Sequence, residues 1–444
     1  MKTTVALILL VLTPAVLAAQ DLSRFEEVTT ANFFGLGARQ MSLGGAGIAS
    51  SLDGAALYYN PAALASIHKI ELQLGLTHQK FSNETSQPAG RYDGFTSVLN
   101  AAKTSQTKTR FGSINLTVPV PTYRGSLALA FGVNRIQSFD RAALFNVIDR
   151  NAEGLLVEDY AKEFEAGGIY IYSAGAGVDV SPNLSLGLAL HVYSGKDDFT
   201  YEYAYRDETN GFGESIDRRV TEDYVGASLK GGLLARPNEN LTIGLTVESP
   251  MDYQVEYVYQ EDYVSSDDPD PVMDAYVVEY DLTRPFVFGG GAAFRIGTFT
   301  VTGDAEYADW SQTAYGDNPD MEIDNDTLSL LYRDVLNLRG GIEYEFPSVG
   351  LALRAGAFSN PLPYRSEAIV DGRNKVYIDS DRKGFSLGFG WLIDDVLLLE
   401  TAYVRGGYTR RFSPANAENV NVGTDLADAE DTFSRVYFTL SYRY

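Results

Sequence analysis

Residues 183–193 read NLSLGLALHVY, and in this segment two kinds of side chain alternate. One face of an extended chain would carry the apolar residues Leu184, Leu186, Leu188, Leu190 and Val192. The other face would carry Asn183, Ser185, Gly187, Ala189 and His191, which are small or polar. A period of two is that of a β-strand, because successive side chains point to opposite sides. Residues 240–249, NLTIGLTVES, repeat the pattern, so both segments predict strands with one apolar face.

Segments of this kind recur along most of the chain. The sequence predicts fourteen strands, near 70–81, 109–119, 125–135, 168–180, 183–205, 216–235, 240–258, 277–296, 298–310, 334–346, 349–359, 384–393, 396–411 and 432–444. The connections alternate between short turns, such as SPN, IGT and IDD, and long loops, such as 82–108, 136–167 and 412–431. An even number of strands with short turns on one side and long loops on the other is typical of a bacterial outer-membrane β-barrel.

The last residues of the chain, FSRVYFTLSYRY, support this fold class. One face of this segment would carry Val436, Phe438, Leu440, Tyr442 and Tyr444. The outward face of a barrel strand needs apolar groups for lipid and aromatic groups at the membrane interface. A terminal strand of this kind also looks like the signal read by the outer-membrane assembly machinery, where Phe is the usual last residue and this chain has Tyr.

The first nineteen residues predict export. Lys2 precedes an apolar run from Val5 to Leu12, and small residues follow at Ala18 and Ala19. This arrangement is typical of a secretory signal peptide, which we expect to be cleaved near Ala18 or Ala19. Its apolar core is too short to span a bilayer as a helix.

Composition excludes several classes of protein. The formal net charge is −24, so we expect no binding to nucleic acid. The 29 Tyr and 23 Phe argue against a disordered acidic chain. The chain has no Cys, which excludes disulfides, thiolate metal sites and a lipid-modified N-terminal cysteine. Carboxylates gather at 260–274 and 416–431, and the spacing resembles no calcium loop, so we interpret them as solvated loop faces rather than cation sites bridging to lipid head groups. We predict no metal and no cofactor.

Residues 43–66, LGGAGIASSLDGAALYYNPAALAS, are rich in Gly and Ala. The three glycines Gly44, Gly45 and Gly47 suggest a phosphate cradle, but no strand precedes them and no Lys-Ser or Lys-Thr pair follows, as a P-loop requires. The segment is too apolar to lie in water. We therefore expect it to fold into the barrel and fill the lumen, with close packing at the glycines and a turn at Asn60–Pro61.

This stretch resembles the N-terminal hatch of the FadL/OmpP1/TodX family of outer-membrane transporters, whose mark is an Asn-Pro-Ala motif, here Asn60, Pro61 and Ala62. The resemblance continues through RPNENLTIGLTVESP (236–250), TFTVTGDAEYADWS (298–311), LNLRGGIEYEF (336–346) and LALRAGAFSNPLPYR (351–365). It implies a signal peptide at 1–19, a hatch at 20–67 and a transmembrane barrel at 68–444.

The resemblance also implies a function. Members of the family are monomeric fourteen-stranded barrels that pass long-chain fatty acids or other hydrophobic molecules inward without energy input. Their substrates bind in an apolar groove outside, move to a pocket in the barrel and leave through a gap in the wall at a kinked strand. The expected partners are hydrophobic ligands, outer-membrane lipids with lipopolysaccharide, and the assembly machinery. Gly132, inside the predicted strand 125–135, is a candidate for the kink. No motif marks the ligand contacts.

Two other functions remain open at this point. A secretion-system shuttle or assembly protein of the PorV type has a similar Gly-rich lead and Asn-Pro-Ala segment, and residues 135–167 would then be a docking loop. Leu144, Phe145, Val147 and Ile148 predict a short amphipathic helix within that loop, either a lid or a packed loop helix. An outer-membrane enzyme would need a general base, and only His68, His78 and His191 are present, without a recognisable Ser or Asp partner. We therefore expect no enzymatic activity.

Overall fold

A computed structural model describes residues 35–86, 91–92, 95–98, 102–150, 155–267, 270–316, 325, 332–363, 368–370, 374–412 and 427–444. The predicted signal peptide and residues 20–34 of the predicted hatch lie outside these residues. Among the described residues, no helix is long and apolar enough to cross a bilayer.

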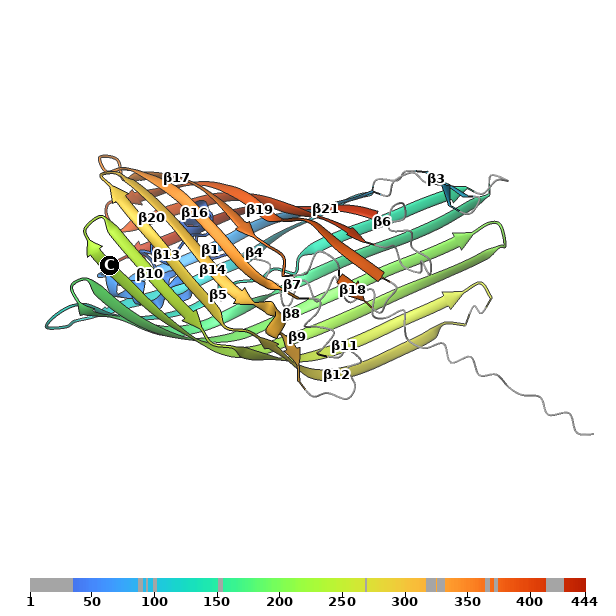
Figure 1. The fold of residues 1–444 in the computed structure, drawn as a ribbon, viewed down its shortest axis with the longest axis horizontal. Coiled ribbons are helices and arrows are strands. Elements are labelled where there is room, and N and C mark those ends of the chain that lie inside the picture. Colours follow the sequence, from blue (N-terminus) through green and yellow to red (C-terminus); the bar gives the residue numbers. More distant parts are fainter. Residues whose placement is uncertain are drawn as a thin grey trace, which may run out of the picture.

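The strands form a closed antiparallel barrel of fourteen wall strands (Figure 1). In chain order the wall consists of β1 (Glu71–Ser86), β4 (Ala102–Val120), β5 (Leu127–Arg135), β7 (Leu156–Ser181), β8 (Leu184–Asp207), β9 (Phe212–Asn238), β10 (Leu241–Glu248) with β11 (Met251–Ser265), β12 (Val272–Arg284) with β13 (Val287–Ile296), β14 (Phe299–Asp309), β16 (Asp334–Phe346), β17 (Leu351–Asn360), β19 (Asn374–Ile393), β20 (Leu397–Phe412) and β21 (Ala427–Arg443). The last strand, β21, pairs with β1 from Glu71↔Arg443 to Ser86↔Asp428, which closes the barrel and removes its edges.

The expected alternation of faces is confirmed. On β8, Leu186, Leu188 and Leu190 are exposed on the outside, whereas Ala189 and His191 are buried in the lumen. The closing strand shows the same division: Phe438, Leu440 and Tyr442 point outward, and the intervening side chains are buried. In a membrane the exposed leucines and aromatics would face lipid.

The connections at the end of the barrel that holds the C-terminus are short, as predicted. They include Pro182–Asn183 between β7 and β8, and Gly297–Thr298 between β13 and β14. Because short turns lie on the periplasmic side of such barrels, this end is the periplasmic one.

At the opposite end several sequence-based boundaries were too short, most clearly that of β7, which begins at Leu156 instead of at 168, whereas the range predicted for β8 is close to the observed one. Strands β7, β8, β9, β11 and β12 continue well beyond the barrel as long hairpins (Figure 1). The outward side chains of these extensions include charged residues such as Lys196, Asp198 and Glu202 instead of leucines. This part of the sheet lies outside the membrane band, so the apolar pattern that predicts a lipid-facing strand is lost while the backbone pairing continues.

Two strands predicted as continuous are interrupted. The predicted strand 240–258 divides into β10 and β11 at Ser249–Pro250, and 277–296 divides into β12 and β13 at Pro285–Phe286. Proline has no backbone N–H to donate to a ladder, so each one ends a strand. The neighbouring strand β9 pairs with β10 at one end and β11 at the other, which keeps the wall closed.

The predicted helix around Leu144–Ile148 is wrong. Residues Arg141–Arg150 form strand β6, which pairs with Leu156–Glu165 of β7 as a hairpin. Backbone pairing with β7 therefore overrides the local helical pattern. The remaining short elements are β2 (Arg91–Tyr92), β3 (Phe95–Val98), β15 (Ala314–Tyr315), β18 (Ala368–Val370) and the 3-10 helix η2 (Trp310–Gln312).

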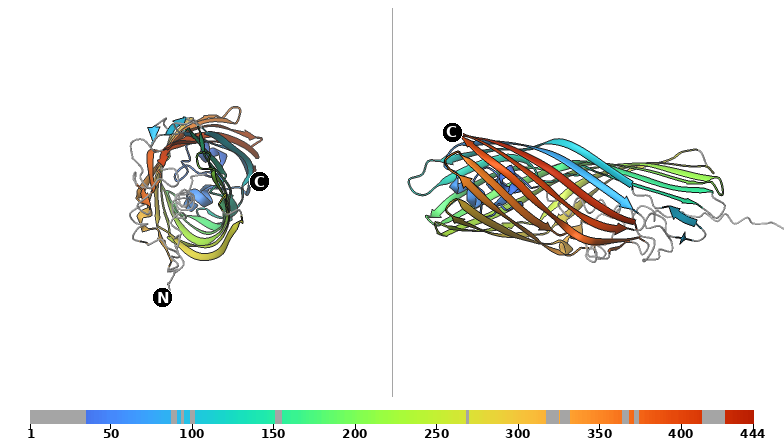
Figure 2. Two further views of the ribbon diagram at one scale, coloured as in Figure 1. Left: turned by 90° about the vertical axis from the view of Figure 1, so that its right-hand side faces the viewer. Right: turned by 90° about the horizontal axis from the view of Figure 1, so that it is seen from above.

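The segment before β1 plugs the lumen. It contains the short helices α2 (Ala38–Ser42) and α3 (Ala56–Tyr59) and the 3-10 helix η1 (Pro61–Ser66). Seen along the barrel axis, these helices lie inside the ring of strands (Figure 2, left), in the same half of the barrel as the C-terminus (Figure 2, right). Almost every side chain from Gly35 to Ile67 is buried. We call residues 35–67 the hatch.

Candidate functional site

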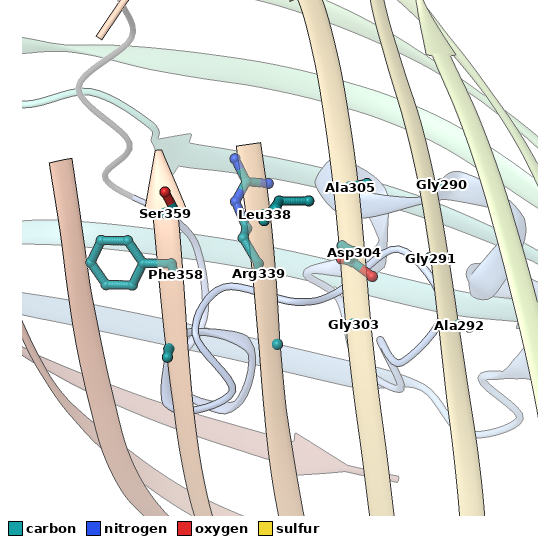
Figure 3. A pocket seen from close by; sticks show the side chains of 12 residues that line it. Gly290, Gly291, Ala292, Gly303, Asp304, Ala305, Leu338, Arg339, Phe358 and Ser359 are labelled. Atoms are coloured by element: carbon teal, nitrogen blue, oxygen red, sulfur yellow. The ribbon is translucent and has the colours of Figure 1, made fainter. Parts of the chain in front are cut away.

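The Gly-rich part of the hatch binds a side-chain carboxylate of the barrel wall. The backbone N–H groups of Gly47 and Ile48 both donate to Oδ2 of Asp304, at 2.6 and 2.8 Å. Asp304 is a buried residue of the wall strand β14 and lies near Arg339 of β16 (Figure 3). Successive backbone N–H groups form a concave donor site of the kind that also binds phosphate. The glycine pattern therefore does make an anion cradle, but a wall carboxylate fills it.

Gly44 lies where the hatch packs closely against the wall. A Cβ atom at this position would be 2.3 Å from the carbonyl oxygen of Ala357 and 2.7 Å from that of Gly340, and its φ is +72°. The Gly44 N–H donates to Oγ of Ser386 on β19 at 2.9 Å. Gly47 is equally crowded from within the hatch, because a Cβ there would be 2.5 Å from the ring of Tyr59. Gly45 has a φ of +85°, in the left-handed region.

Asn60 joins three parts of the molecule. Its Nδ2 donates to the carbonyl oxygens of Ile48 in the hatch and Leu233 on β9, at 2.9 and 3.1 Å. Its Oδ1 accepts from the N–H of Ala62 at 3.1 Å and so caps η1, with Pro61 in the first position of that helix. The Asn-Pro-Ala motif thus fixes η1 against both the hatch and the wall.

The sequence analysis missed the wall glycines that receive this motif. Gly187 and Gly232 lie directly against the motif. A Cβ at Gly187 would lie 2.2 Å from the carbonyl carbon of Pro61, and a Cβ at Gly232 would lie 2.1 Å from Oδ1 of Asn60. A Cβ at Gly177 would lie 2.6 Å from the Pro61 carbonyl oxygen. The only signal in the sequence is that each glycine lies on the face of its strand that carries no lipid-facing apolar residues. This signal does not show that the hatch motif is what packs against it.

Ion pairs hold the hatch to the wall on the β16–β20 side. Arg39 of α2 donates to Oε1 of Glu343 at 2.8 Å, and both side chains are buried. Arg354 of β17 contacts the other oxygen of Glu343 at 2.5 Å and Glu400 at 2.9 Å. Removing one member of such a buried network leaves an uncompensated charge, so the network strongly favours the seated hatch.

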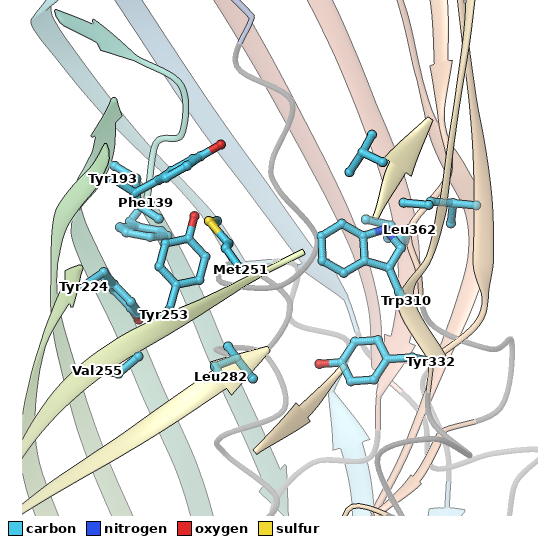
Figure 4. Close-up of a cluster of buried hydrophobic side chains, with 14 of the residues drawn as sticks. Phe139, Tyr193, Tyr224, Met251, Tyr253, Val255, Leu282, Trp310, Tyr332 and Leu362 are labelled. Carbon is cyan, nitrogen blue, oxygen red and sulfur yellow. The ribbon is translucent and has the colours of Figure 1, made fainter. Parts of the chain in front are cut away.

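An enclosed cavity of about 60 Å³ lies on the extracellular side of the hatch. Tyr58 of α3 contributes to it from the hatch. Its other ring-bearing lining residues are Tyr193, Tyr253 and Trp310. Figure 4 shows Tyr193, Tyr253 and their neighbours facing Trp310 and Tyr332 across the lumen. These rings belong to the largest buried apolar cluster among the described residues, which gives the cavity an aromatic wall.

The cavity is also charged. Glu248 lies 3.4 Å from Nζ of Lys230 and 3.6 Å from a guanidinium nitrogen of Arg284, and it accepts from the hydroxyl of Tyr193 at 2.5 Å. Glu306 lies 3.1 Å from Arg339. Arg382 of β19 is a further lining residue. The cavity thus combines aromatic surface with four cationic side chains and two carboxylates.

The barrel wall is interrupted beside this cavity. Strand β5 ends at Arg135, and Ile136–Asp140 separates from β4 while its backbone stays hydrogen-bonded to Gly167 and Ile169 of β7. Within this segment Gln137, Ser138, Phe139 and Asp140 are all buried. Ile136 and Gln137 line the cavity. The chain then continues as β6, which pairs with β7. Within the described residues, the part of β4 from Ala102 to Gly112 therefore has no ladder partner on its β5 side.

Side chains cross this interruption where backbone hydrogen bonds do not. Arg110 of β4 forms an ion pair with Asp140 at 2.6 Å, and Asp140 also accepts from Arg135 at 2.9 Å. Gln106 donates to the carbonyl oxygen of Glu165 at 3.2 Å. Side-chain contacts can separate without breaking a sheet. We call this seam between β4 and the β6–β7 hairpin the lateral seam.

Gly132 lies close to the lateral seam but in regular structure. The register of β4 with β5 runs without a shift from Ser113↔Asn134 to Val120↔Leu127, and β5 remains paired with β7 around Gly132. A Cβ at Gly132 would be 1.9 Å from Oδ1 of Asn115. The separation of the chain from β4 begins three residues later, after Arg135.

The histidines and acidic loops show no catalytic or metal arrangement in the described part of the chain. Ser173 and His191, which sequence reasoning did not pair, lie with Oγ and Nδ1 2.7 Å apart, but both are buried. No group of three or more His, Asp and Glu residues that could hold a metal is found among the described residues. Most of the 416–431 segment lies outside them.

The sequence model of a family described as outer membrane protein transport protein (OMPP1/FadL/TodX) matches residues 15–444. The chain belongs to this family. Because the family consists of outer-membrane transport proteins, the barrel is an outer-membrane one and the extended hairpins lie on its extracellular side. No curated protein matches this chain in sequence.

Solved structures agree in fold. A FadL homologue from Pseudomonas aeruginosa aligns with a TM-score of 0.62 at 15% identity, covering 92% of this chain and 98% of the other. The toluene transporter TodX of P. putida aligns with a TM-score of 0.59 at 12% identity, covering 93% and 99%. CymD, a monoaromatic hydrocarbon channel, gives 0.52 at 14% identity, covering 93% and 99%. Identities this low show the shared barrel, not a shared substrate.

Proposed function

We propose that this protein is a passive channel for the uptake of long-chain fatty acids or other hydrophobic small molecules across the outer membrane. A substrate binds in the cavity on the extracellular side of the hatch and leaves sideways, through the lateral seam, into the membrane. The structures that share the fold include transporters of toluene and a channel for monoaromatic hydrocarbons, which supports a hydrophobic substrate.

One observation carries this proposal: the segment that lines the cavity is also the one that separates from β4. Ile136 and Gln137 border the cavity, and from here on the chain is hydrogen-bonded to β7 but no longer to β4. Phe111 of β4, next to the seam, is exposed on the lipid side. A path from the cavity to the bilayer therefore needs only side chains such as Arg110 and Asp140 to separate.

The hatch makes this path preferable to an axial one. It is fixed to the wall by the bonds of Asp304, the Arg39–Glu343 pair and the Asn60 contacts. An apolar substrate that leaves sideways also avoids water, and each methylene kept in an apolar environment is worth about 0.8 kcal/mol.

The remaining expectations belong to the same proposal. The protein acts as a monomer without cofactor or catalysis, after cleavage of its signal peptide near Ala18 or Ala19. The complete hatch comprises residues 20–67, of which the structure describes 35–67, with Asn60, Pro61 and Ala62 as the fixing motif and Gly44, Gly45 and Gly47 as close-packing positions. Outer-membrane lipids and lipopolysaccharide surround the barrel, and the assembly machinery reads its last strand.

The test is uptake of a labelled long-chain fatty acid and of labelled toluene by cells that lack their own hydrophobe channel, with and without this gene. Restored uptake of either compound supports the channel. Unchanged uptake with the barrel present in the outer membrane contradicts it, and co-purification of a secreted protein would then favour the shuttle function of the PorV type.

The route is tested in a cysteine-free background, which the native chain provides. In the double variant Arg110→Cys/Asp140→Cys, a short bifunctional thiol reagent ties β4 to the segment that separates from it. We expect cross-linking to abolish uptake and reduction of the linker to restore it. The matched control is Lys162→Cys/Glu202→Cys, an ion pair of 3.1 Å across the intact β7–β8 ladder, where cross-linking leaves uptake unchanged. Full uptake with the seam cross-linked would overturn the sideways route.

A further inference from the structure

Arg382 is a buried cation that forms no ion pair with any carboxylate of the described residues. The residue is 4% exposed and lines the cavity. Its guanidinium lies over the ring of Tyr408, 5.5 Å from the ring centre. No carboxylate within the described residues forms an ion pair with it, whereas the other cations of the cavity, Lys230, Arg284 and Arg339, each have a glutamate within 4 Å. A buried charge of this kind is costly unless a counter-ion joins it.

A second unsatisfied group lies directly beside it. Asn360 of β17 is the register partner of Arg382 on β19, is 2% exposed and lines the same cavity. Neither its Oδ1 nor its Nδ2 has a hydrogen-bond partner in the part of the chain that the structure describes. Buried side-chain amides normally have hydrogen-bond partners. An amide without one, next to a cation without a carboxylate partner among the described residues, suggests a missing ligand. Together the two side chains offer a guanidinium fork and an amide N–H, which are the donors that a carboxylate accepts.

The rest of the cavity limits the body of that ligand. Its volume of about 60 Å³ holds a few water molecules, since a single water needs roughly 10–15 Å³ of such space, so a larger ligand enters only as the lining side chains move apart. A compact body requires less of this movement than the extended tail of a long fatty acid. Tyr58, Tyr193, Tyr253 and Trp310 supply ring faces and edges, which favour an aromatic body.

We propose that the cavity selects small aromatic carboxylates, with the carboxylate on Arg382 and Asn360 and the ring among the tyrosines and Trp310. This inference rests on the proposed function as a channel and names its substrate class. The charge of the cavity sets it apart from a binding site for a neutral hydrocarbon, for which an unpaired buried arginine would be only a cost.

Trp310 gives a direct readout. The chain has two tryptophans, and the other, Trp391, is exposed on the lipid side of β19. In a Trp391→Phe background, the fluorescence of Trp310 in the purified full-length protein is titrated with benzoate and with benzamide, which has the same ring but no charge. We expect saturable binding of benzoate, tighter than that of benzamide.

The variants separate recognition from structure. Arg382→Gln should weaken benzoate binding about tenfold or more, as for loss of a hydrogen bond to a charged group, and change benzamide binding less than about threefold. Arg382→Lys should retain part of the preference for benzoate, and Asn360→Leu should weaken benzoate binding. The matched control is Arg295→Gln, an exposed arginine at the periplasmic end of β13, which should change neither affinity. Heat-modified mobility in gels verifies that each barrel is folded.

Each other outcome overturns the inference. Equal weakening of benzoate and benzamide by Arg382→Gln would give Arg382 a purely structural role. Tighter binding of laurate than of benzoate at Trp310 would exclude an aromatic selectivity. If the protein restores uptake of toluene or a fatty acid but does not bind benzoate, this inference is wrong and the proposed channel function stands. If the protein neither restores uptake nor binds benzoate, the channel function is wrong as well.

Discussion

Asp304 of the barrel wall accepts a 2.6 Å hydrogen bond from the backbone N–H of Gly47 in the hatch. The same carboxylate oxygen accepts from Ile48, so one buried side chain holds the turn of the Gly-rich segment. This contact explains why a sequence that suggests a phosphate cradle needs no phosphate. The wall supplies the negative charge, and the cradle serves to seat the hatch.

Asp304→Asn should loosen the hatch without unfolding the barrel. The amide keeps the shape of the side chain but loses the charge that strengthens both bonds, at a cost of about 1–3 kcal/mol. The measurement is the rate at which a maleimide labels a single cysteine placed at Ala49, which is buried in the hatch. We expect faster labelling in the Asp304→Asn background than in the Asp304 parent. An unchanged rate would mean that other contacts alone hold the segment.

Gly44→Ala should prevent the hatch from seating. The added Cβ would lie 2.3 Å from a backbone oxygen of the wall, and the left-handed φ adds about 1–2 kcal/mol of strain. Gly211→Ala is the matched control, because Gly211 has a similar φ of +74° but nothing within 4 Å of a Cβ. Limited proteolysis of the hatch should therefore accelerate in Gly44→Ala and remain unchanged in Gly211→Ala. Equal behaviour of the two variants would attribute the effect to backbone strain alone.

Asn60→Ala combined with Pro61→Ala should lower hydrophobe uptake while the barrel still assembles. The double variant removes the bonds to Ile48 and Leu233 and the cap of η1, and loss of the cap alone costs about 1 kcal/mol. Asn60→Asp retains the capping oxygen but loses the two donated bonds, so it separates the two roles. Uptake assays with outer-membrane protein levels as the control make the comparison. Normal uptake in the double variant would show that the motif is dispensable.

Leu188→Lys and Glu202→Lys should differ sharply, although both lie on the outward face of β8. Leu188 is 58% exposed in the lipid-facing band, where a lysine costs about 2–4 kcal/mol near the bilayer midplane. Glu202 lies in the extension of β8 beyond the apolar band, paired with Lys162, where a lysine replaces one solvated charge by another. Urea titration of the folded fraction in lipid vesicles should show destabilisation by Leu188→Lys alone. Equal destabilisation would place the extension inside the membrane.

The barrel could be predicted from the sequence because its cause is local. Leu186, Leu188 and Leu190 alternate with small residues because every membrane strand faces lipid on one side and the lumen on the other. The same reasoning failed where lipid is absent. The predicted strand 183–205 included almost all of the extracellular extension of β8, but the predicted strand 168–180 missed residues 156–167 of β7, which only their pairing with β6 and β8 shows to be strand.

Local pattern also failed where pairing competes with it. Leu144–Ile148 has a helical distribution of apolar residues, yet it forms strand β6 because β7 offers a complete ladder. The breaks at Pro250 and Pro285 were present in the sequence, since proline cannot donate to a ladder, but the apolar alternation on both sides concealed them.

The sequence by itself determined the strand periodicity, the even number of wall strands and a glycine-rich segment before the first strand. These features depend on neighbours a few residues apart. The tertiary structure alone decided that Asp304 fills the cradle of Gly47, that Gly187 and Gly232 receive the Asn-Pro-Ala motif, and that Arg382 and Asn360 lie side by side at one cavity. Those relationships join residues far apart in the chain, and the closure of the barrel around the hatch brings them together.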